Sequence, residues 1–268
     1  MHTLRKYAIT FSLGMQQSME YRFDFVLQLV SAFFPIIIQW FMWTAIFAQK
    51  STMYGYTFRE LILYTILAGI LSKVVSTGGI EYDIKEDIKQ GGLNKYLIKP
   101  FSYFGFRIVS FLGRKIFYFG ISLLIVALLL LVLNAVWSVE ISPVRAIVFA
   151  VALFLALALN FLISYCISSA SFWLAEISYL YVITGLLVQI ISGGIFPLEI
   201  FGDTFYAVSR FLPFFYTIYY PINVLNGRLP DHQILDGLLM QLGWIVLLLL
   251  LGRVLWKAGL REYSGMGG

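Results

Sequence analysis

Hydrophobic residues along this chain fall in runs of about twenty, separated by short polar stretches. A helix of about twenty apolar residues crosses the roughly 30 Å hydrocarbon core of a bilayer. Transmembrane barrels show short alternating segments instead. The pattern therefore predicts an all-α integral membrane protein with six transmembrane helices. They cover approximately residues 24–47, 58–76, 116–136, 144–172, 177–196 and 238–256.

The first 22 residues show a different pattern and divide the chain into two parts, 1–22 and a six-span domain at 23–268. Apolar positions recur there at spacings of three and four, with charged and polar residues on the other faces. They are Leu4, Ala8, Phe11, Met15 and Met19. This spacing predicts an amphipathic helix in the membrane interface. Such a helix either only anchors the first span or takes part in gating.

Charge of both signs is concentrated in residues 80–100, after the second predicted span. Ile80, Ile84 and Ile88 lie four apart, which predicts a short amphipathic helix, and Gly91 and Gly92 end it. Anionic lipid headgroups would repel its four acidic residues. An apolar stripe within mixed charge favours a docked protein partner over a solvated loop. The candidate docking residues are Glu81, Asp83, Ile84, Lys85, Glu86, Asp87, Ile88, Lys89, Gly91, Gly92 and Leu93.

Residues 193–232, between the fifth and sixth predicted spans, are apolar but interrupted by glycine and proline. Lipid cannot satisfy the backbone groups of a broken helix. The segment is therefore expected to pack on protein, or to enter the outer side of the membrane and return. Its aromatic residues from Phe211 to Tyr220 suit the outer interface. Anchoring there is favoured over contact with a substrate.

Composition agrees with a membrane protein, since 60% of the residues are hydrophobic, 12% are charged and the mean hydropathy is +0.85. Placing both termini and the loop after the second span in the cytoplasm puts fourteen of the nineteen Lys and Arg residues on that side. The positive-inside rule selects this orientation. The net charge of +5 then reflects cytoplasmic loops rather than nucleic-acid binding.

The sequence contains no recognisable catalytic or cofactor-binding pattern. Cys166 is the single cysteine, so an intrachain disulfide is excluded. His2 and His232 lack neighbouring ligands for a metal site, and no phosphate-binding loop is present. The centres of the predicted spans carry almost no ionisable residues, which argues against a proton- or sodium-coupled carrier. No cofactor is expected on this chain.

Small and polar residues repeat every four positions on the fourth predicted span. The ridge comprises Ala152, Ala156, Asn160, Ser164 and Ser168, and the second span has a similar set at Ala68, Ser72 and Ser76. Such ridges let helices approach closely and hydrogen-bond. They serve either helix packing within the chain or a subunit interface and pathway wall. The candidates for the second role are Gln39, Asn160, Ser164 and Gln189.

Three stretches carry a resemblance to a known family. "IKQGGLNKYLIKPFSY", "ISGGIFPLEIF" and "LPFFYTIYYPINVLNG", together with the N-terminal amphipathic helix, resemble type-2 ABC exporter permeases. The similar branch contains compact six-span permeases of bacterial drug and antibiotic exporters. The family does not fix the cargo, because its members carry lipids, glycolipids, polysaccharides, peptides or hydrophobic drugs.

This resemblance implies a multi-pass protein of the bacterial inner membrane. The segment after the second span would be a coupling helix seated in an ATPase. Two ATPase subunits would hold ATP and Mg, and an identical or homologous second permease would complete the pathway. The broken outer segment would form re-entrant helices that cap it. Reversing the charges of Asp83, Glu86 and Asp87 together is expected to uncouple transport. A gradient-driven carrier or channel, and a membrane assembly or sensor subunit, remain as alternatives.

Overall fold

The computed structural model describes residues 2–20, 22–77, 79–98, 102–137, 142–174 and 176–263. Within these residues the regular elements are helices, and the strand-like pairing is an isolated bridge between Met53 and Tyr56. The predicted N-terminal helix (1–22), the charged segment (80–100) and the six-span domain (23–268) each include residues that lie outside these described ranges. The prediction of an all-α fold is confirmed for the part of the chain that is described.

Four helical stretches among the described residues are long and apolar enough to cross a membrane. The first is Phe58–Lys89, in which α3 (Phe58–Val75) and α4 (Ile80–Lys89) lie. The second is α6 (Tyr103–Trp137), and the third is Pro143–Phe172, in which α7 (Pro143–Ser169) lies. The fourth is α11 (Asp231–Glu262). Two shorter apolar helices, Phe33–Phe47 within α2 (Arg22–Phe47) and Ser178–Ile191 (α8), match the other predicted runs. The count of six crossings stays a prediction.

Two of the long helices begin earlier than hydropathy predicts. The structure starts α6 at Tyr103 rather than near residue 116, and α11 at Asp231 rather than near 238. In α6 the additional turns carry Arg107 and Arg114, whose side chains form ion pairs with α4. Hydropathy detects only the apolar part of such a helix, whereas the backbone hydrogen bonds continue past it.

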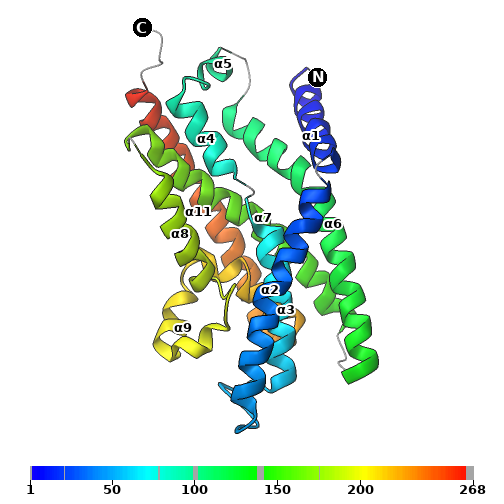
Figure 1. The fold of residues 1–268 in the computed structure, drawn as a ribbon. Helices are drawn as coiled ribbons and strands as arrows, with labels where there is room; N and C mark the ends of the chain where they lie inside the picture. Colours follow the sequence, from blue (N-terminus) through cyan, green and yellow to red (C-terminus); the bar gives the residue numbers. More distant parts are fainter. Residues whose placement is uncertain are drawn as a thin grey trace.

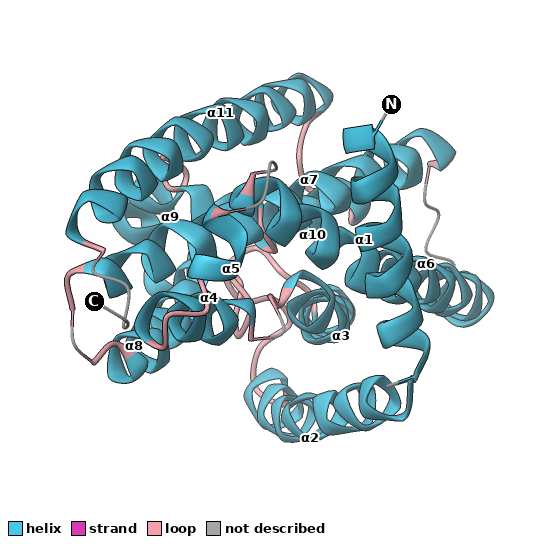
Figure 2. Ribbon diagram, turned by 90° about the horizontal axis from the view of Figure 1, so that it is seen from above, coloured by secondary structure: helices cyan, strands magenta, loops and turns pink. Residues whose placement is uncertain are grey.

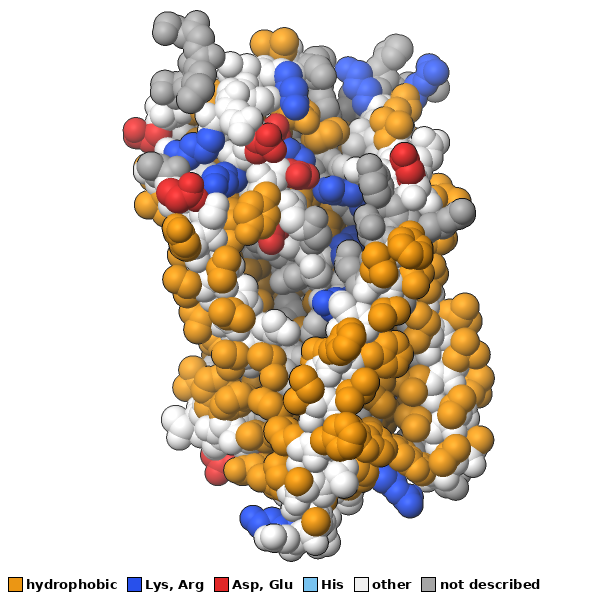
Figure 3. Space-filling view, in the orientation of Figure 1, with side chains coloured by type: hydrophobic (Ala, Val, Ile, Leu, Met, Phe, Trp, Pro, Cys, Tyr) orange, Lys and Arg blue, Asp and Glu red, His pale blue; other side chains and the backbone are white. Residues whose placement is uncertain are grey.

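The helices form an elongated bundle, and α4, α5 (Asn94–Leu97), the start of α1 and the end of α11 lie at the same end (Figure 1). Charged side chains gather at this end, which is called the charged end below, while hydrophobic side chains cover most of the remaining face (Figure 3). The shared position of both ends of the chain is consistent with an even number of crossings.

Burial differs strongly between helices in the middle of the bundle and helices at its edge. Seen along the bundle, α3 and α10 (Tyr219–Leu225) lie inside, and α2, α6, α8 and α11 lie at the periphery (Figure 2). All seven residues of α10 are buried. By contrast, only 17% of the apolar window of α6 or of α11 is buried within the protein. The peripheral helices therefore present apolar surface that suits lipid.

The broken segment packs on protein, as the sequence predicts. It forms η2 (Leu198–Phe201), α9 (Asp203–Ser209), η3 (Pro213–Tyr216) and α10. Its backbone is hydrogen-bonded to the bundle, because the Tyr64 hydroxyl donates to the Gly193 carbonyl at 2.7 Å and the Tyr219 amide donates to the Ser192 carbonyl at 2.9 Å. How deeply these elements enter a membrane stays a prediction.

Most of the aromatic residues of this segment are buried in the protein, and their position at the membrane interface stays a prediction. Phe215, Tyr216, Tyr219 and Tyr220 are each no more than 5% exposed, whereas Phe211 is 73% exposed. The tyrosine hydroxyls find partners inside the protein. Tyr216 donates to the Arg210 carbonyl at 2.8 Å, Tyr220 to the Ile234 carbonyl at 2.6 Å and Tyr219 to the Glu199 carboxylate at 2.5 Å. These bonds take the place of the interfacial water that a surface tyrosine would bind.

Helix α1 (His2–Glu20) packs along α6 at the charged end. Two glycines permit the approach, because a Cβ atom on Gly113 would lie 2.4 Å from the Phe11 carbonyl oxygen and one on Gly14 would lie 2.7 Å from that of Ser110. Ser18 donates to the Arg114 carbonyl at 2.5 Å. Half-buried Phe11 and Met15 face inward on the predicted apolar stripe, whereas Leu4, Ala8 and Met19 are exposed. Its interfacial position stays a prediction.

Candidate functional site

The charged segment folds into the short helix that its sequence predicts. Helix α4 covers Ile80–Lys89, and Gly91 follows it with a φ of 73°, a left-handed conformation that glycine adopts without strain. Ile80, Ile84 and Ile88 are at most 5% exposed. They belong to the main core, in which α4 packs against α7. The apolar stripe is therefore covered by the protein itself rather than left open for a partner.

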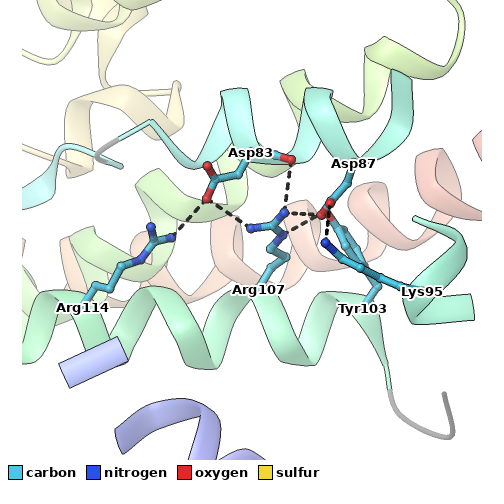
Figure 4. Close-up of polar contacts among 6 residues, drawn as sticks. All are labelled: Asp83, Asp87, Lys95, Tyr103, Arg107 and Arg114. Atoms are coloured by element: carbon cyan, nitrogen blue, oxygen red, sulfur yellow. Dashed lines mark hydrogen bonds and ion pairs between the residues drawn. The ribbon is translucent and has the colours of Figure 1, made fainter. Parts of the chain in front are cut away.

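Arg107 of α6 joins two acidic residues of α4, as Figure 4 shows. Its Nη1 donates to Asp83 Oδ2 at 3.2 Å, its Nη2 donates to the Asp83 carbonyl at 3.1 Å, and Nη2 also pairs with the Asp87 carboxylate. The side chains of Arg107 and Asp87 are each only 9% exposed. Arg114 Nη2 lies 3.6 Å from Asp83 Oδ2. Buried charges persist in proteins when they are paired and hydrogen-bonded in this way.

Tyr103 and Lys95 complete the surroundings of Asp87. The Tyr103 hydroxyl donates to Asp87 Oδ2 at 2.7 Å and accepts from Arg107 Nε at 2.9 Å. Lys95 Nζ lies 3.6 Å from the other carboxylate oxygen, Asp87 Oδ1. The Tyr103 ring stacks on Trp256 of α11 with centroids 4.7 Å apart. This network fixes α4 and the start of α5 to α6, and Tyr103 joins α6 to α11.

A second set of contacts joins α4 to the start of α8. Lys85 Nζ donates to Glu176 Oε1 at 3.0 Å and to Ser178 Oγ at 2.7 Å. The Tyr181 hydroxyl donates to the Glu81 carbonyl at 3.1 Å. Hydrogen bonds from the Ser178 side chain and backbone, with a smaller contribution from Lys85, lower the pKa of Glu176 to about 2. A displacement of α4 is thus opposed by α6, α7 and α8 together.

The eleven predicted docking residues do not form one surface. Ile84, Ile88 and Leu93 are buried, and Asp83, Lys85 and Asp87 pair with other helices of the same chain. Glu81 accepts from Thr77 Oγ1 at 2.7 Å, and Lys89, Gly91 and Gly92 are half-buried. Glu86 is exposed. The exposed residues of α4, α5 and the positions that follow each helix, called the exposed α4–α5 face below, are Tyr82, Glu86, Gln90, Asn94, Lys95, Leu97 and Ile98.

Sequence reasoning did not identify Tyr103, Arg107 or Arg114 as members of this site. A signal was present, because the three lie four and seven residues apart and so share one face of a helix. Asp83 and Asp87, also four apart, share a face of α4. The sequence contains no signal that these two faces meet.

A second feature is a polar cavity of about 330 Å³ lined by α3, α7, α8 and neighbouring segments. The face drawn in Figure 3 is hollowed at mid-height. Neutral side chains dominate the lining, with Lys73 and Glu81 as its charged members. The neutral polar residues are Ser72, Ser76, Thr77, Asn160, Ser164, Thr184, Gln189, Ser192 and Thr217. The cavity offers many hydrogen-bond donors and acceptors to a ligand, because hydroxyl and amide groups supply both.

Three of the four pathway candidates, Asn160, Ser164 and Gln189, lie in this cavity. Gln39 is not part of its lining, and its Oε1 accepts from Thr65 Oγ1 at 3.1 Å across the contact between α2 and α3. Asn160 Nδ2 donates to the carbonyl of Val75, the last residue of α3, at 2.5 Å. Asn160 therefore holds α3 against α7 as well as lining the cavity.

The ridge of small residues on α7 has two environments. Ala152 and Ala156 are fully buried. Gln241 of α11 donates from Nε2 to the carbonyls of Ala152 and Tyr216, both at 2.9 Å. Asn160 and Ser164 line the cavity, and Ser168 is buried with its hydroxyl bonded to the Ser164 carbonyl. One half of the ridge thus serves helix packing and the other half forms a polar wall.

The described residues contain no group of three or more His, Cys, Asp or Glu side chains placed to hold a metal ion. Comparison with known proteins gives one finding on the family. A family model described as "ABC-2 family transporter protein" matches residues 33–267. No curated protein and no solved structure matches the chain.

Proposed function

Since the chain belongs to the ABC-2 transporter family, we propose that it is the permease subunit of an ATP-driven exporter. It moves a hydrophobic or amphipathic substrate outward across the plasma membrane. Two separate ATPase subunits bind ATP and Mg and supply the energy, and a second permease, identical or homologous, completes the pathway. The charged end faces the cytoplasm, as the positive-inside rule requires.

The position of α4 among the other helices is the observation that carries this proposal. Arg107 joins Asp83 and Asp87 to α6, Lys85 joins α4 to the start of α8, and the isoleucine stripe packs against α7. A force applied to α4 therefore acts on several membrane helices at once. An ATPase that pushes the exposed α4–α5 face would shift these helices together, which is the role of a coupling helix.

The polar cavity suits the polar part of an amphipathic substrate. Its wall is formed by α3, α7 and α8, and α8 is directly joined to α4 through Lys85 and Tyr181. A movement of α4 would change the shape of this cavity. Its hydroxyl and amide groups can donate hydrogen bonds to a polar headgroup and accept them from it.

The test is reconstitution of the full chain in vesicles with and without its ATPase. The chain is first purified in mild detergent, and a co-purifying ATPase is identified by its phosphate-binding loop and its ATP hydrolysis. We expect substrate flux only with both proteins and ATP. Flux without the ATPase would show a gradient-driven carrier or channel. Binding of partners without nucleotide-dependent flux would show an assembly or sensor subunit.

A further inference from the structure

A second cavity, of about 510 Å³, lies where the ends of four helices meet at the end opposite α4. It lies between the start of α3, the end of α6, the start of α7 and the end of α10. The lining residues that matter below are Arg59, Glu60, Trp137, Ser142, Arg145 and Asn226. None of them belongs to the α4 contacts or to the polar cavity described above.

The acidic residues at this cavity are already paired. Glu60 accepts from the backbone and hydroxyl of Thr57 in a capping box at the start of α3, and it lies 3.7 Å from Arg228. Asp231 pairs with Arg145 Nη2 at 2.7 Å. Among the described residues at or beside this cavity, three arginines (Arg59, Arg145 and Arg228) and two acids leave one arginine, Arg59, without an acidic partner.

Arg59 packs against an aromatic ring instead. Its guanidinium lies over the Trp137 ring, 5.8 Å from the centroid, and forms no ion pair with the described residues. An arginine held over a tryptophan keeps its hydrogen-bond donors available for an anion.

Neutral donors accompany this charge. Asn226 Nδ2 and Oδ1 are both buried and have no hydrogen-bond partner among the described residues, which is costly unless a ligand supplies one. Ser142 precedes α7 and its side chain makes no capping bond. The 27-residue helix α7 begins at Pro143, so its N-terminus adds a partial positive charge beside the cavity. Guanidinium, amide and hydroxyl donors together suit phosphate oxygens.

Exposed aliphatic side chains, which suit contact with lipid acyl chains, lie next to the cavity residues in the sequence. Val136 precedes Trp137 on α6, Val144 and Ile147 flank Arg145 on α7, and each of the three is 67% exposed. Tryptophan at the end of a membrane helix is typical of the interface where headgroups lie. A phosphate seated in the cavity would therefore have acyl chains beside these aliphatic residues.

We propose that this cavity binds the phosphodiester headgroup of an anionic phospholipid from the leaflet opposite α4. Arg59 and Asn226 supply donors that the other described residues leave unused. The site requires only that this end of the bundle lies at a membrane interface, so it holds whether or not the exporter assignment is correct.

The experiment titrates purified full-length protein in detergent with short-chain phosphatidylglycerol and follows lipid adducts by native mass spectrometry and thermal unfolding. We expect Arg59→Gln to weaken lipid binding about tenfold, the loss of one charge-assisted hydrogen bond. Arg210→Gln is the matched control, because it removes the same charge at the same end from a residue outside the cavity. Asn226→Leu, which keeps Arg59, is also expected to weaken binding.

Three comparisons decide the source and specificity of the ligand. Soluble glycerol phosphate and phosphatidylcholine are each expected to bind at least tenfold more weakly than phosphatidylglycerol. Equal binding of glycerol phosphate would show a site for soluble phosphate rather than lipid, and equal binding of phosphatidylcholine would show that the lipid's charge is not recognised. Equal losses in Arg59→Gln and Arg210→Gln would show a diffuse surface charge. Any of these three results overturns the proposal.

Discussion

The guanidinium of Arg107 and the carboxylate of Asp87 form an ion pair in which each side chain is only 9% exposed. The pair lies between α6 and α4, and Tyr103 is hydrogen-bonded to both residues. A buried pair of this kind contributes little net stability when compared with well-packed apolar residues, but the loss of one partner leaves an uncompensated charge. Replacing only one residue of the pair should therefore cause a measurable loss of stability.

Arg107→Ala is expected to lower the free energy of unfolding by about 3–5 kcal/mol, because Asp87 would remain buried without its main partner. Thermal and denaturant unfolding in detergent measure the change. The double variant Arg107→Met with Asp87→Leu should recover a large part of the loss, since it removes both charges. If the double variant is no more stable than Arg107→Ala, packing rather than charge pairing holds α4.

Charge reversal within α4 should have different effects at the two acids that pair with Arg107 and at an acid that does not. Asp83→Lys with Asp87→Lys is expected to detach α4 from α6 and destabilise the fold, because both residues face Arg107. Glu86→Lys lies on the exposed α4–α5 face and should change stability by less than about 0.5 kcal/mol. We expect it to reduce ATPase binding instead.

The triple reversal of Asp83, Glu86 and Asp87 therefore cannot separate docking from folding, and Glu86→Lys is the sharper test. Pull-down of the ATPase and ATP-dependent flux, measured beside the unfolding curve, give the two readouts. Normal ATPase recovery and flux with Glu86→Lys would place the contact with the ATPase away from Glu86.

Gly113→Ala is expected to displace α1 from α6, because the added Cβ would lie 2.4 Å from the Phe11 carbonyl oxygen. Overpacking of this kind costs about 1–3 kcal/mol. Limited proteolysis of α1 and thermal unfolding report the change. Gly120→Ala is the control on the same helix, since a Cβ there meets nothing within 4 Å. Equal behaviour of the two variants would contradict the close approach of α1 and α6.

Glu176 should stay ionised to lower pH than an ordinary glutamate, because its pKa is lowered from 4.5 to about 2. A lowered pKa means that the contact is fully present above about pH 4.5 and is lost as the pH falls through about 2. Carboxyl NMR of labelled glutamate, assigned with Glu176→Gln, measures the titration. Ser178→Ala and Lys85→Met should each raise the pKa of Glu176. A titration near 4.5 in the unmodified protein would show that the contact is absent.

Asn160→Ala is expected to cost about 1–3 kcal/mol, since the Val75 carbonyl at the end of α3 would lose its partner. Asn160→Asp should be worse, because a carboxylate cannot donate to a carbonyl. Gln189→Ala removes an exposed amide from the same cavity and serves as the control for stability. Unfolding in detergent distinguishes the three variants, and a harmless Asn160→Asp would refute the role of Asn160 in holding α3.

Hydropathy and spacing predicted a large share of the fold from individual segments. The second predicted span, 58–76, agrees with α3 at Phe58–Val75, and the isoleucine spacing with Gly91 predicted α4. Prediction was less accurate where a helix extends beyond its apolar residues, as α6 does from Tyr103. The turns outside the apolar run are stabilised by contacts with other helices. Three of the four pathway candidates lie together, although nothing in the sequence separates Gln39 from them.

The sequence by itself determined which segments are long and apolar enough to cross a membrane, since that criterion depends only on local length and apolarity. It also determined the amphipathic form of α4, because 3.6 residues per turn place Ile80, Ile84 and Ile88 on one face. The tertiary structure alone decided that this face is buried, that Asp83 and Asp87 meet Arg107, and that Tyr219 is enclosed within the protein. Those contacts join residues from different helices, so they depend on how the helices cross one another.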